Sequence, residues 1–200
     1  MGIEGAVAIL NIATNDDLSV KDEMAYYGTV GVCEIGSLTT DFPIMKKLQP
    51  DNRFSHGEYF GIASYLDAIR QDVYEKFGYN FQSRAKLVKR IRESSYLINL
   101  VGERRSDIKP IVDEHFWRAA VRVVDLIHKR WAKYPDAQAF YVLGGGASAL
   151  RPYIEEITHG KLPLRFVNDS EWQNAAGYLK MLKNQGVTQD LNQPNSGGSW

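Results

Sequence analysis

The 200-residue chain has little cysteine and no excess of charge of either sign, and each shortage excludes a class of protein. Cys33 is the single cysteine, so no disulfide can form within the chain, and we expect a small buried side chain in a reducing, cytoplasmic setting. Lys and Arg together number 24, as do Asp and Glu, which gives no indication of a general nucleic-acid or membrane surface. The four histidines share no metal-ligand spacing, so we expect structural or surface roles for them.

Long hydrophobic runs are also missing. The longest one near the start, Gly5–Leu10, is far too short to span a bilayer, and no basic segment precedes it as in a signal peptide. Hydrophobic residues nevertheless make up 44% of the chain, which is ordinary for a globular protein with a buried core. The length predicts one domain or two small lobes.

Apolar periodicity predicts an α/β fold. Strands are expected at residues 29–34, 41–48, 139–143 and 164–167, the first two forming a hairpin. Helices are expected at 59–77, with Tyr59 in the apolar stripe and Gly78 as the stop, and at 83–93, 110–134, 149–157 and 171–183. Residues 5–13 fit a short helix or a strand, 14–27 and 51–57 fit loops, and 95–110 look irregular or partly stranded.

This order predicts a mixed sheet flanked by helices. We expect residues 1–50 and 136–185 to form the sheet-containing lobe. Residues 51–135 would be an inserted, mainly helical subdomain with its connecting helix. Residues 186–200, which are rich in Gly, Gln, Asn and Ser, are expected to be a disordered tail.

The stretch YVLGGGASAL, Tyr141–Leu150, places three glycines directly after a buried strand. Glycine permits positive φ and close approach of another group to the backbone. A strand–glycine–helix turn also directs the N–H groups of a helix N-terminus at a phosphate or a nucleotide. No Gly-Lys-Ser/Thr follows, which excludes a P-loop, and the pattern is not G-x-G-x-x-G. A tight turn without a ligand remains an open alternative.

A second loop, EIGSLTTD at Glu34–Asp41, joins the two strands of the predicted hairpin. Such a turn can gather backbone N–H groups and hydroxyls around phosphate oxygens, and a neighbouring carboxylate can hold Mg²⁺ through water. A plain hairpin with threonines in its strands is the alternative. Ligands of α/β sheets bind at the carboxyl ends of strands, so we expect the two loops to meet around one nucleotide.

Together the two loops resemble those of the actin-like ATPase superfamily, which includes actin, the seventy-kilodalton heat-shock proteins, MreB and the ParM/StbA plasmid segregation proteins. Glu34–Asp41 is similar to its second phosphate motif, and YVLGGGAS to its adenosine motif. EGAVAIL resembles the segment that leads into the second half of the fold. Asn174 and Gly177 match the Asn-x-x-Gly pattern of the closing helix, which favours the ParM/StbA branch. The resemblance covers about residues 4–184, but only the second half of the family's fold.

The resemblance implies an actin-like/ribonuclease H-like ATPase lobe, with a smaller helical subdomain inserted between the two nucleotide loops, that binds ATP or ADP and Mg²⁺. Glu34 would be the catalytic carboxylate beside Mg²⁺, with Asp41 as a second metal-side carboxylate or simply part of the hairpin. The implied nucleotide-binding residues are Gly36, Ser37, Thr39 and Thr40 at the phosphates, Gly144, Gly145, Gly146 and Ser148 at the adenosine, and Lys89 and Arg90 at the adenine and ribose. An ordinary solvated face is the alternative for Lys89 and Arg90.

The implied function is that of a filament-forming cytoskeletal ATPase for plasmid or DNA segregation. Its partners would be further copies of itself and a DNA-bound adaptor, with no direct contact to nucleic acid or membrane, and this chain alone would be inactive. Glu34 stands where the family has Asp, and Ser37 and Leu38 replace glycines, so hydrolysis is in question. A non-hydrolysing scaffold or adaptor of the same fold and a small-molecule kinase of the same superfamily therefore remain as alternatives. The first lobe is missing from this chain, and the sequence leaves open whether it belongs to the same polypeptide.

Overall fold

The structure is a computed structural model that describes residues 5–53, 55–102, 104–170 and 172–184. The tail expected at 186–200 lies outside these residues. The helices are α1 (Ala8–Ala13), α2 (Glu23–Tyr27), α3 (Ile62–Phe77), α4 (Arg84–Arg92), α5 (Lys109–Lys133), α6 (Ala147–Thr158) and α7 (Gln173–Asn184). The strands are β1 (Thr29–Ile35), β2 (Thr40–Phe42), β3 (Ile44–Lys46), β4 (Gln49–Pro50), β5 (His56–Glu58), β6 (Leu97–Asn99), β7 (Arg105–Asp107), β8 (Phe140–Leu143) and β9 (Leu164–Phe166).

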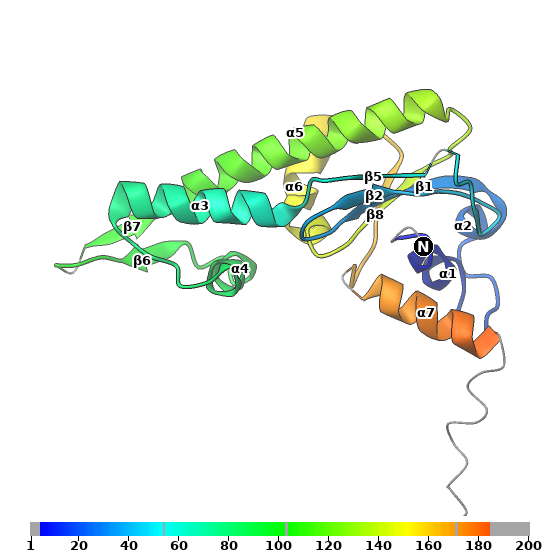
Figure 1. Cartoon of the computed structure of the whole chain (residues 1–200), viewed down its shortest axis with the longest axis horizontal. Helices are drawn as coiled ribbons and strands as arrows, with labels where there is room; N and C mark the ends of the chain where they lie inside the picture. Colours follow the sequence, from blue (N-terminus) through cyan, green and yellow to red (C-terminus); the bar gives the residue numbers. More distant parts are fainter. Residues whose placement is uncertain (1–4, 54, 103, 171, 185–200) are drawn as a thin grey trace, which may run out of the picture.

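The predicted α/β class, a mixed sheet flanked by helices, is confirmed. Figure 1 shows the sheet between two helical layers, with the long α5 and α6 on one face and α1, α2 and α7 on the other. At the far end, α3, α4 and the small β6–β7 hairpin form an arm beside the N-terminal half of α5. Two buried clusters fill the spaces between the layers, and Cys33 lies fully buried in the one on the α5 side, as expected. No helix within the described residues has the length and apolar character to cross a bilayer.

The hairpin predicted around Glu34–Asp41 is confirmed, but its second strand is interrupted. Glu34 pairs with Asp41 and Thr29 with Lys46, in one continuous antiparallel register along β1. Between β2 and β3 stands Pro43, which has no N–H to donate, while its carbonyl still accepts a hydrogen bond from the Val32 N–H (2.9 Å). On the other side of β1, β8 and β9 pair in parallel.

Two boundary predictions are wrong. The segment expected to be a loop at 51–57 enters the sheet, because His56–Glu58 pairs with β2 as β5. Tyr59 is 98% exposed and lies outside the helix, which begins at Ile62. The stop at Gly78 is confirmed, with φ at 67°. The division into a lobe and an inserted subdomain stays a prediction, and the sheet extends into the range assigned to the insert.

The second half of the loop expected at 14–27 forms α2, which the sequence pattern did not reveal. Asp22 caps this helix by accepting a hydrogen bond from the Ala25 N–H (3.1 Å). The same carboxylate accepts from the Tyr141 hydroxyl (2.6 Å) and pairs with Arg165 (3.0 Å), two residues on β8 and β9. Tertiary contacts with distant strands thus fix a five-residue helix that propensity alone does not favour.

The closing helix α7 packs directly on α1, and the Asn-x-x-Gly pattern explains how. Gly177 faces the backbone of the turn before α1, where an added methyl group would lie 2.1 Å from the Val7 carbonyl oxygen. Asn174, one turn earlier, accepts a hydrogen bond from the Gly5 N–H (3.3 Å) and donates to Glu34 on β1. The pattern therefore joins α7 to both α1 and the sheet.

We predict that Gly177→Ala lowers the free energy of unfolding by about 1–3 kcal/mol, because the methyl group overlaps the Val7 carbonyl. At an open helix position the same change stabilises by about 0.5–1 kcal/mol, so the sign of the effect is diagnostic. Urea denaturation measures it, with Ala175→Gly at an exposed α7 position as a propensity control that costs about 1 kcal/mol. A gain in stability for Gly177→Ala would contradict the close approach of α7 to α1.

The lowered pKa of Asp22 predicts that the stability contributed by this residue depends on pH. Burial alone would raise this pKa, but the hydrogen bonds from Tyr141 and Ala25 and the charge of Arg165 outweigh it and hold the pKa below its usual value. A lowered folded-state pKa stabilises fully above the unfolded-state value, and this contribution disappears as the pH falls below about 4. Asp22→Asn is therefore expected to cost about 1–2 kcal/mol at pH 7 and progressively less below pH 4.

Melting temperatures recorded from pH 7 down to pH 3 measure this dependence. Asp136→Asn, at an exposed position, is the matched control and is expected to follow the wild-type curve throughout. A constant gap between wild type and Asp22→Asn over the whole range would show that the charge of Asp22 has no part in holding α2.

Candidate functional site

The two loops singled out in the sequence leave the sheet side by side. Glu34 on β1 pairs in parallel with Leu143 on β8, so the hairpin and the glycine turn begin at the same edge. The Gly146 N–H donates a hydrogen bond to the carbonyl oxygen of Ile35 (2.9 Å), which joins the turn to the hairpin directly. The predicted meeting of the two loops is therefore present in the structure.

The three glycines of the turn have different surroundings. Gly144 has φ at 94°, and a side chain there would lie 2.5 Å from the Ile35 carbonyl oxygen. A side chain at Gly146 would overlap the side chain of Ile35. Gly145 has no described atom within 4 Å of the place where a side chain would begin, so it leaves open space beside the turn. Gly144 and Gly146 serve the packing of the loops, whereas Gly145 faces a cavity.

Ser170, in the loop between β9 and α7, fastens the glycine turn from its other side. Its hydroxyl donates to the carbonyl oxygen of Gly144 (3.0 Å), and its own carbonyl accepts from the Gly144 N–H (3.2 Å). The Ser148 hydroxyl, in the first turn of α6, lies 3.4 Å from that of Ser170. The start of α6 is thus held on two sides by backbone and hydroxyl groups.

The open side of Gly145 belongs to a cavity of about 540 Å³ between α4 and α6. Val88 and Ile91 of α4 form part of one wall, and Ser148 and Tyr153 of α6 part of the other. Mostly apolar walls with a few polar groups are typical of small-molecule sites. The Tyr153 hydroxyl donates to Asp113 (2.7 Å), and burial together with this acceptor raises the pKa of Tyr153.

The tip of the hairpin is held by hydrogen bonds within the protein. The Gly36 N–H donates to the Thr39 carbonyl (2.9 Å) and closes the turn. The first N–H groups of α3, at Ile62 and Ala63, donate to the carbonyls of Gly36 (3.1 Å) and Ser37 (2.9 Å). Thr40 is fully buried, and its hydroxyl donates to a backbone carbonyl at Phe60 (2.7 Å). Several groups expected to face phosphates are thus already used inside the fold.

Two carboxylates lie next to each other at the base of this hairpin. Glu34 and Asp41 are directly opposite on neighbouring strands and so share one face of the sheet. Glu34 is only 8% exposed and accepts a hydrogen bond from the Asn174 amide (2.5 Å). Asp41 accepts from the Thr39 hydroxyl (3.2 Å). Among the residues that the structure describes, no group of three or more His, Cys, Asp or Glu side chains forms a metal site, but Mg²⁺ often binds to one or two carboxylates, with waters and phosphate oxygens completing its shell.

The remaining sequence candidates lie away from the cavity. Leu38 is 72% exposed at the tip of the hairpin and does not adopt positive φ, so it fits the turn without strain. Lys89 lies 3.8 Å from Glu93, and Arg90 donates to the Leu97 carbonyl (2.8 Å); both line a different hollow. Their predicted place at the adenine and ribose stays a prediction.

α4 contributes Val88, Ile91 and Arg92 to the cavity, and none of the three was among the residues expected at the nucleotide. In the structure both Val88 and Ile91 are only partly buried. The apolar positions of the helix expected at 83–93 were the signal that could have found them. Tyr153 was missed because only the fold brings α6 opposite α4.

Comparisons with known proteins place this geometry in a family. A family model for the C-terminal part of archaeal MreB-like actin homologues matches residues 32–156, well over half of the chain. The fold is that of the actin-like proteins, and the chain belongs to this MreB-like family. No curated protein matches the sequence.

Solved structures agree on the fold. ParM of Bacillus thuringiensis, solved with ATP, superimposes with a TM-score of 0.72 at 18% identity, over 92% of this chain and 55% of ParM. The actin-like protein Alp7A superimposes with a TM-score of 0.71 at 18% sequence identity, over 94% of this chain and 54% of Alp7A. Ta0583, an archaeal actin homologue, superimposes with a TM-score of 0.68 at 18% sequence identity, over 91% of this chain and 55% of Ta0583. The chain therefore spans only about half the length of these similar structures.

The close contact between the hairpin and the start of α3 predicts that a side chain at Gly61 destabilises the protein. A methyl group at Gly61 would lie 2.3 Å from the Ser37 carbonyl oxygen, so Gly61→Ala must push the hairpin away from the start of α3. We expect it to cost about 1–3 kcal/mol of stability, measured by urea denaturation. Gly145→Ala, which meets open space, is the matched control and should stay within about 0.5 kcal/mol of wild type. Equal stability of the two variants would contradict this reading of the hairpin contact.

Proposed function

We propose that this chain is the nucleotide-binding lobe of an actin-like, filament-forming ATPase, and that the cavity between α4 and α6 takes the adenosine of ATP or ADP. The observation that carries the proposal is the open side of Gly145, where the cavity meets the turn joined to the hairpin. The apolar walls at Val88 and Ile91 suit a purine base, and the Ser148 hydroxyl at the cavity suits a ribose oxygen. The similar ParM of Bacillus thuringiensis has been solved with ATP and with ADP, which supports the choice of ligand.

The phosphates would lie over the hairpin, beyond the cavity. The Ser37 hydroxyl is the group of the turn that can donate to them, because the Thr39 hydroxyl donates to Asp41 and the Thr40 hydroxyl donates to the Phe60 carbonyl. Mg²⁺, when bound, neutralises phosphate charge. Asp41 and Glu34 would hold it through water, with Thr39 orienting the Asp41 carboxylate and Asn174 orienting Glu34.

The complete protein would add the other lobe. Since the chain spans about half of the similar structures, we assign hydrolysis and filament assembly to the complete protein. Self-association would be its main interaction. A role in plasmid or DNA segregation, with a DNA-bound adaptor and in the cytoplasm, is the finer part of the proposal, and the similarity to ParM supports it.

A non-hydrolysing scaffold of the same fold is the second candidate, and the hairpin favours it. The Gly36 N–H and the Thr40 hydroxyl are bound within the protein, and Glu34 is buried against Asn174. A hairpin with these groups committed can support binding of the adenosine without aligning a phosphate for attack. Measurement of ATP turnover by the complete protein separates the two candidates.

We predict that Mg-ATP and Mg-ADP raise the melting temperature of this chain, since a ligand that binds only the folded state adds about 2.7 kcal/mol at a hundred times its Kd. Gly145→Leu fills the cavity from its open side and should abolish the shift. Glu156→Leu places the same side chain on the exposed face of α6 and should leave the shift unchanged. The readout is a thermal titration to millimolar nucleotide.

The outcomes separate the parts of the proposal. A saturable shift that only Gly145→Leu removes supports the adenosine site. An equal shift in Gly145→Leu and wild type would place the nucleotide elsewhere. If the complete protein, with both lobes present, shows no shift with either nucleotide, the nucleotide-binding function is wrong.

A further inference from the structure

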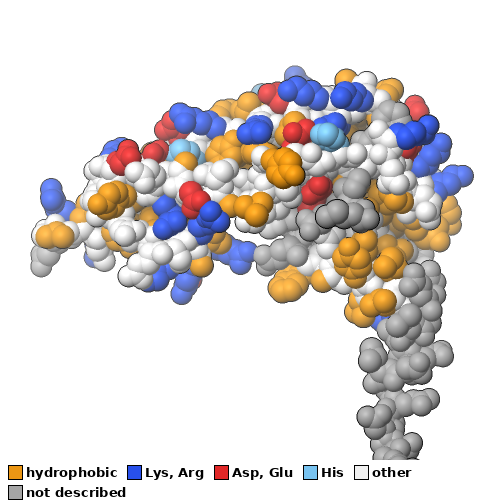
Figure 2. All heavy atoms as spheres, in the orientation of Figure 1, with side chains coloured by type: hydrophobic (Ala, Val, Ile, Leu, Met, Phe, Trp, Pro, Cys, Tyr) orange, Lys and Arg blue, Asp and Glu red, His pale blue; other side chains and the backbone are white. Residues whose placement is uncertain are grey.

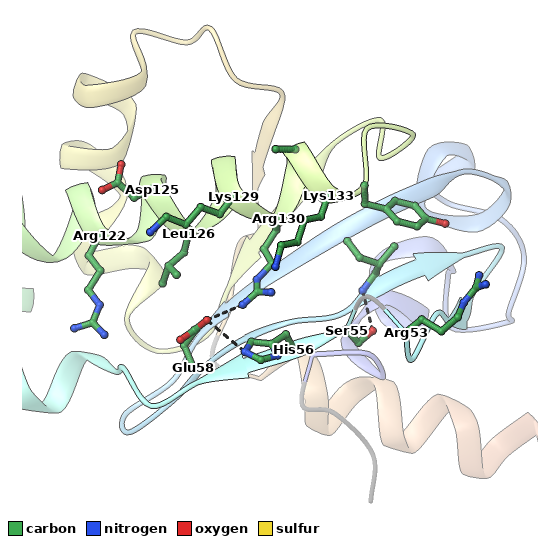
Figure 3. A pocket seen from close by; sticks show the side chains of 13 residues that line it. Arg53, Ser55, His56, Glu58, Arg122, Asp125, Leu126, Lys129, Arg130 and Lys133 are labelled. Atoms are coloured by element: carbon green, nitrogen blue, oxygen red, sulfur yellow. Dashed lines mark hydrogen bonds and ion pairs between the residues drawn. The ribbon is translucent and has the colours of Figure 1, made fainter.

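A second hollow, of about 870 Å³, lies between β5 and the C-terminal half of α5. We call it the α5–β5 groove, and Figure 3 shows it from close by. Positive side chains gather in it although the whole chain has a net charge of zero. The groove is lined by the cations Arg53, Arg122, Lys129, Arg130 and Lys133, by His56 and by two carboxylates, Glu58 and Asp125. Figure 2 shows the same predominance of Lys and Arg over α5 at the upper side of the molecule.

Several of these charges are already paired inside the protein. Arg130 donates to the Glu58 carboxylate (2.6 Å), and the His56 ring lies 3.5 Å from the same oxygen. Arg53 pairs with Asp51 (2.9 Å). Arg122 stacks over the Phe60 ring, with 4.4 Å between its guanidinium carbon and the ring centroid. The carboxylate of Glu58 is therefore already occupied by Arg130 and His56.

Lys129 and Lys133 differ from these residues. Both are exposed, both line the groove, and no side chain of the described residues pairs with either ammonium group. In Figure 3 they extend from one face of α5, and no interaction joins them to their neighbours. Two ammonium groups without partners on one wall, with further cations beside them, attract an acidic ligand.

The spacing of the cations suits an extended peptide. Arg122, Lys129 and Lys133 lie on one face of α5 and span about 16 Å along it, which is the length of about five extended residues. Lys129 and Lys133 are about 6 Å apart along the axis, close to the roughly 6.6 Å between alternate side chains of a strand. Carboxylates at alternate positions of a peptide can therefore meet both.

The opposite wall is an edge of the sheet. β5 pairs with β2, and within the described part of the chain no strand pairs with its outer side. An extended segment can add to such an edge through main-chain hydrogen bonds. Leu126, which is partly exposed, also lines the groove and offers a contact to an apolar side chain. A continuous phosphate backbone fits less well, because it has no main-chain amide groups that can pair with the edge of β5.

We propose that the α5–β5 groove binds an extended acidic segment of a partner protein, with its carboxylates at Lys129 and Lys133 and its backbone beside β5. The proposal is independent of the nucleotide cavity, since the two hollows share no lining residue.

Fluorescence anisotropy with the full chain tests it. The probe is a fluorescein-labelled hexapeptide, Thr-Glu-Val-Glu-Thr-Glu, and its counterpart with Gln in place of Glu is the ligand control. We expect saturable binding of the Glu peptide that weakens about tenfold in Lys129→Glu/Lys133→Glu, a change equivalent to about 1.4 kcal/mol. Lys76→Glu/Lys161→Glu makes the same change of charge at exposed positions outside the groove and should bind within about twofold of wild type.

Equal weakening in the two charge-reversal variants, or equal affinity for the Glu and Gln peptides, would overturn the proposal. A twelve-base-pair DNA duplex serves as competitor, and displacement of the peptide at lower concentration than by unlabelled peptide would assign the groove to nucleic acid instead. If Lys129→Glu/Lys133→Glu melts below wild type, Lys129→Gln/Lys133→Gln replaces it, with an expected weakening of about threefold. Unchanged affinity in that variant also overturns the proposal.

Discussion

Parallel pairing of β1 with β8 brings Glu34 beside Leu143 and makes the chain leave the sheet twice at one edge, more than a hundred residues apart. Everything in the candidate site follows from this pairing. The Ile35 carbonyl can bind the Gly146 N–H only in this register, and a shift by one residue would turn each side chain of the strand to the other face. Since both faces of β1 are buried, the register is strongly specified by packing.

The closing helix completes the site from the face opposite α5. Asn174 reaches the Glu34 carboxylate, while Gly177 lets α7 lie directly against the backbone at Val7. A buried carboxylate is costly unless it is hydrogen-bonded, so the amide of Asn174 helps Glu34 to remain at this position. The Asn-x-x-Gly pattern is thus explained by packing and hydrogen bonding alone. Glu34, at the base of the hairpin, is bound by a helix residue that lies 140 positions later in the chain.

The sequence predicted the features that arise from local patterns. The buried strand at Phe140–Leu143, the glycine turn and its meeting with the hairpin follow from apolar runs and from the rule that ligand loops gather at the carboxyl ends of strands. It failed where distant contacts decide. α2 exists because Asp22 meets Tyr141 and Arg165, and β5 because a short polar segment finds the edge of β2. The sequence also did not indicate that Val88 and Ile91, on the same helix as Lys89 and Arg90, line the cavity.

One helix lines both the cavity beside the glycine turn and the α5–β5 groove. Phe116, in the N-terminal half of α5, contributes to the cavity beside the glycine turn, and Lys129 contributes to the groove at the C-terminal end. Thirteen residues of helix separate them, about 20 Å along the axis. The backbone hydrogen bonds of a helix make it move largely as one body, and Figure 1 shows α5 running without a break from the arm to the far end of the sheet. The cavity beside the glycine turn and the α5–β5 groove therefore lie along one continuous helix, although they share no lining residue.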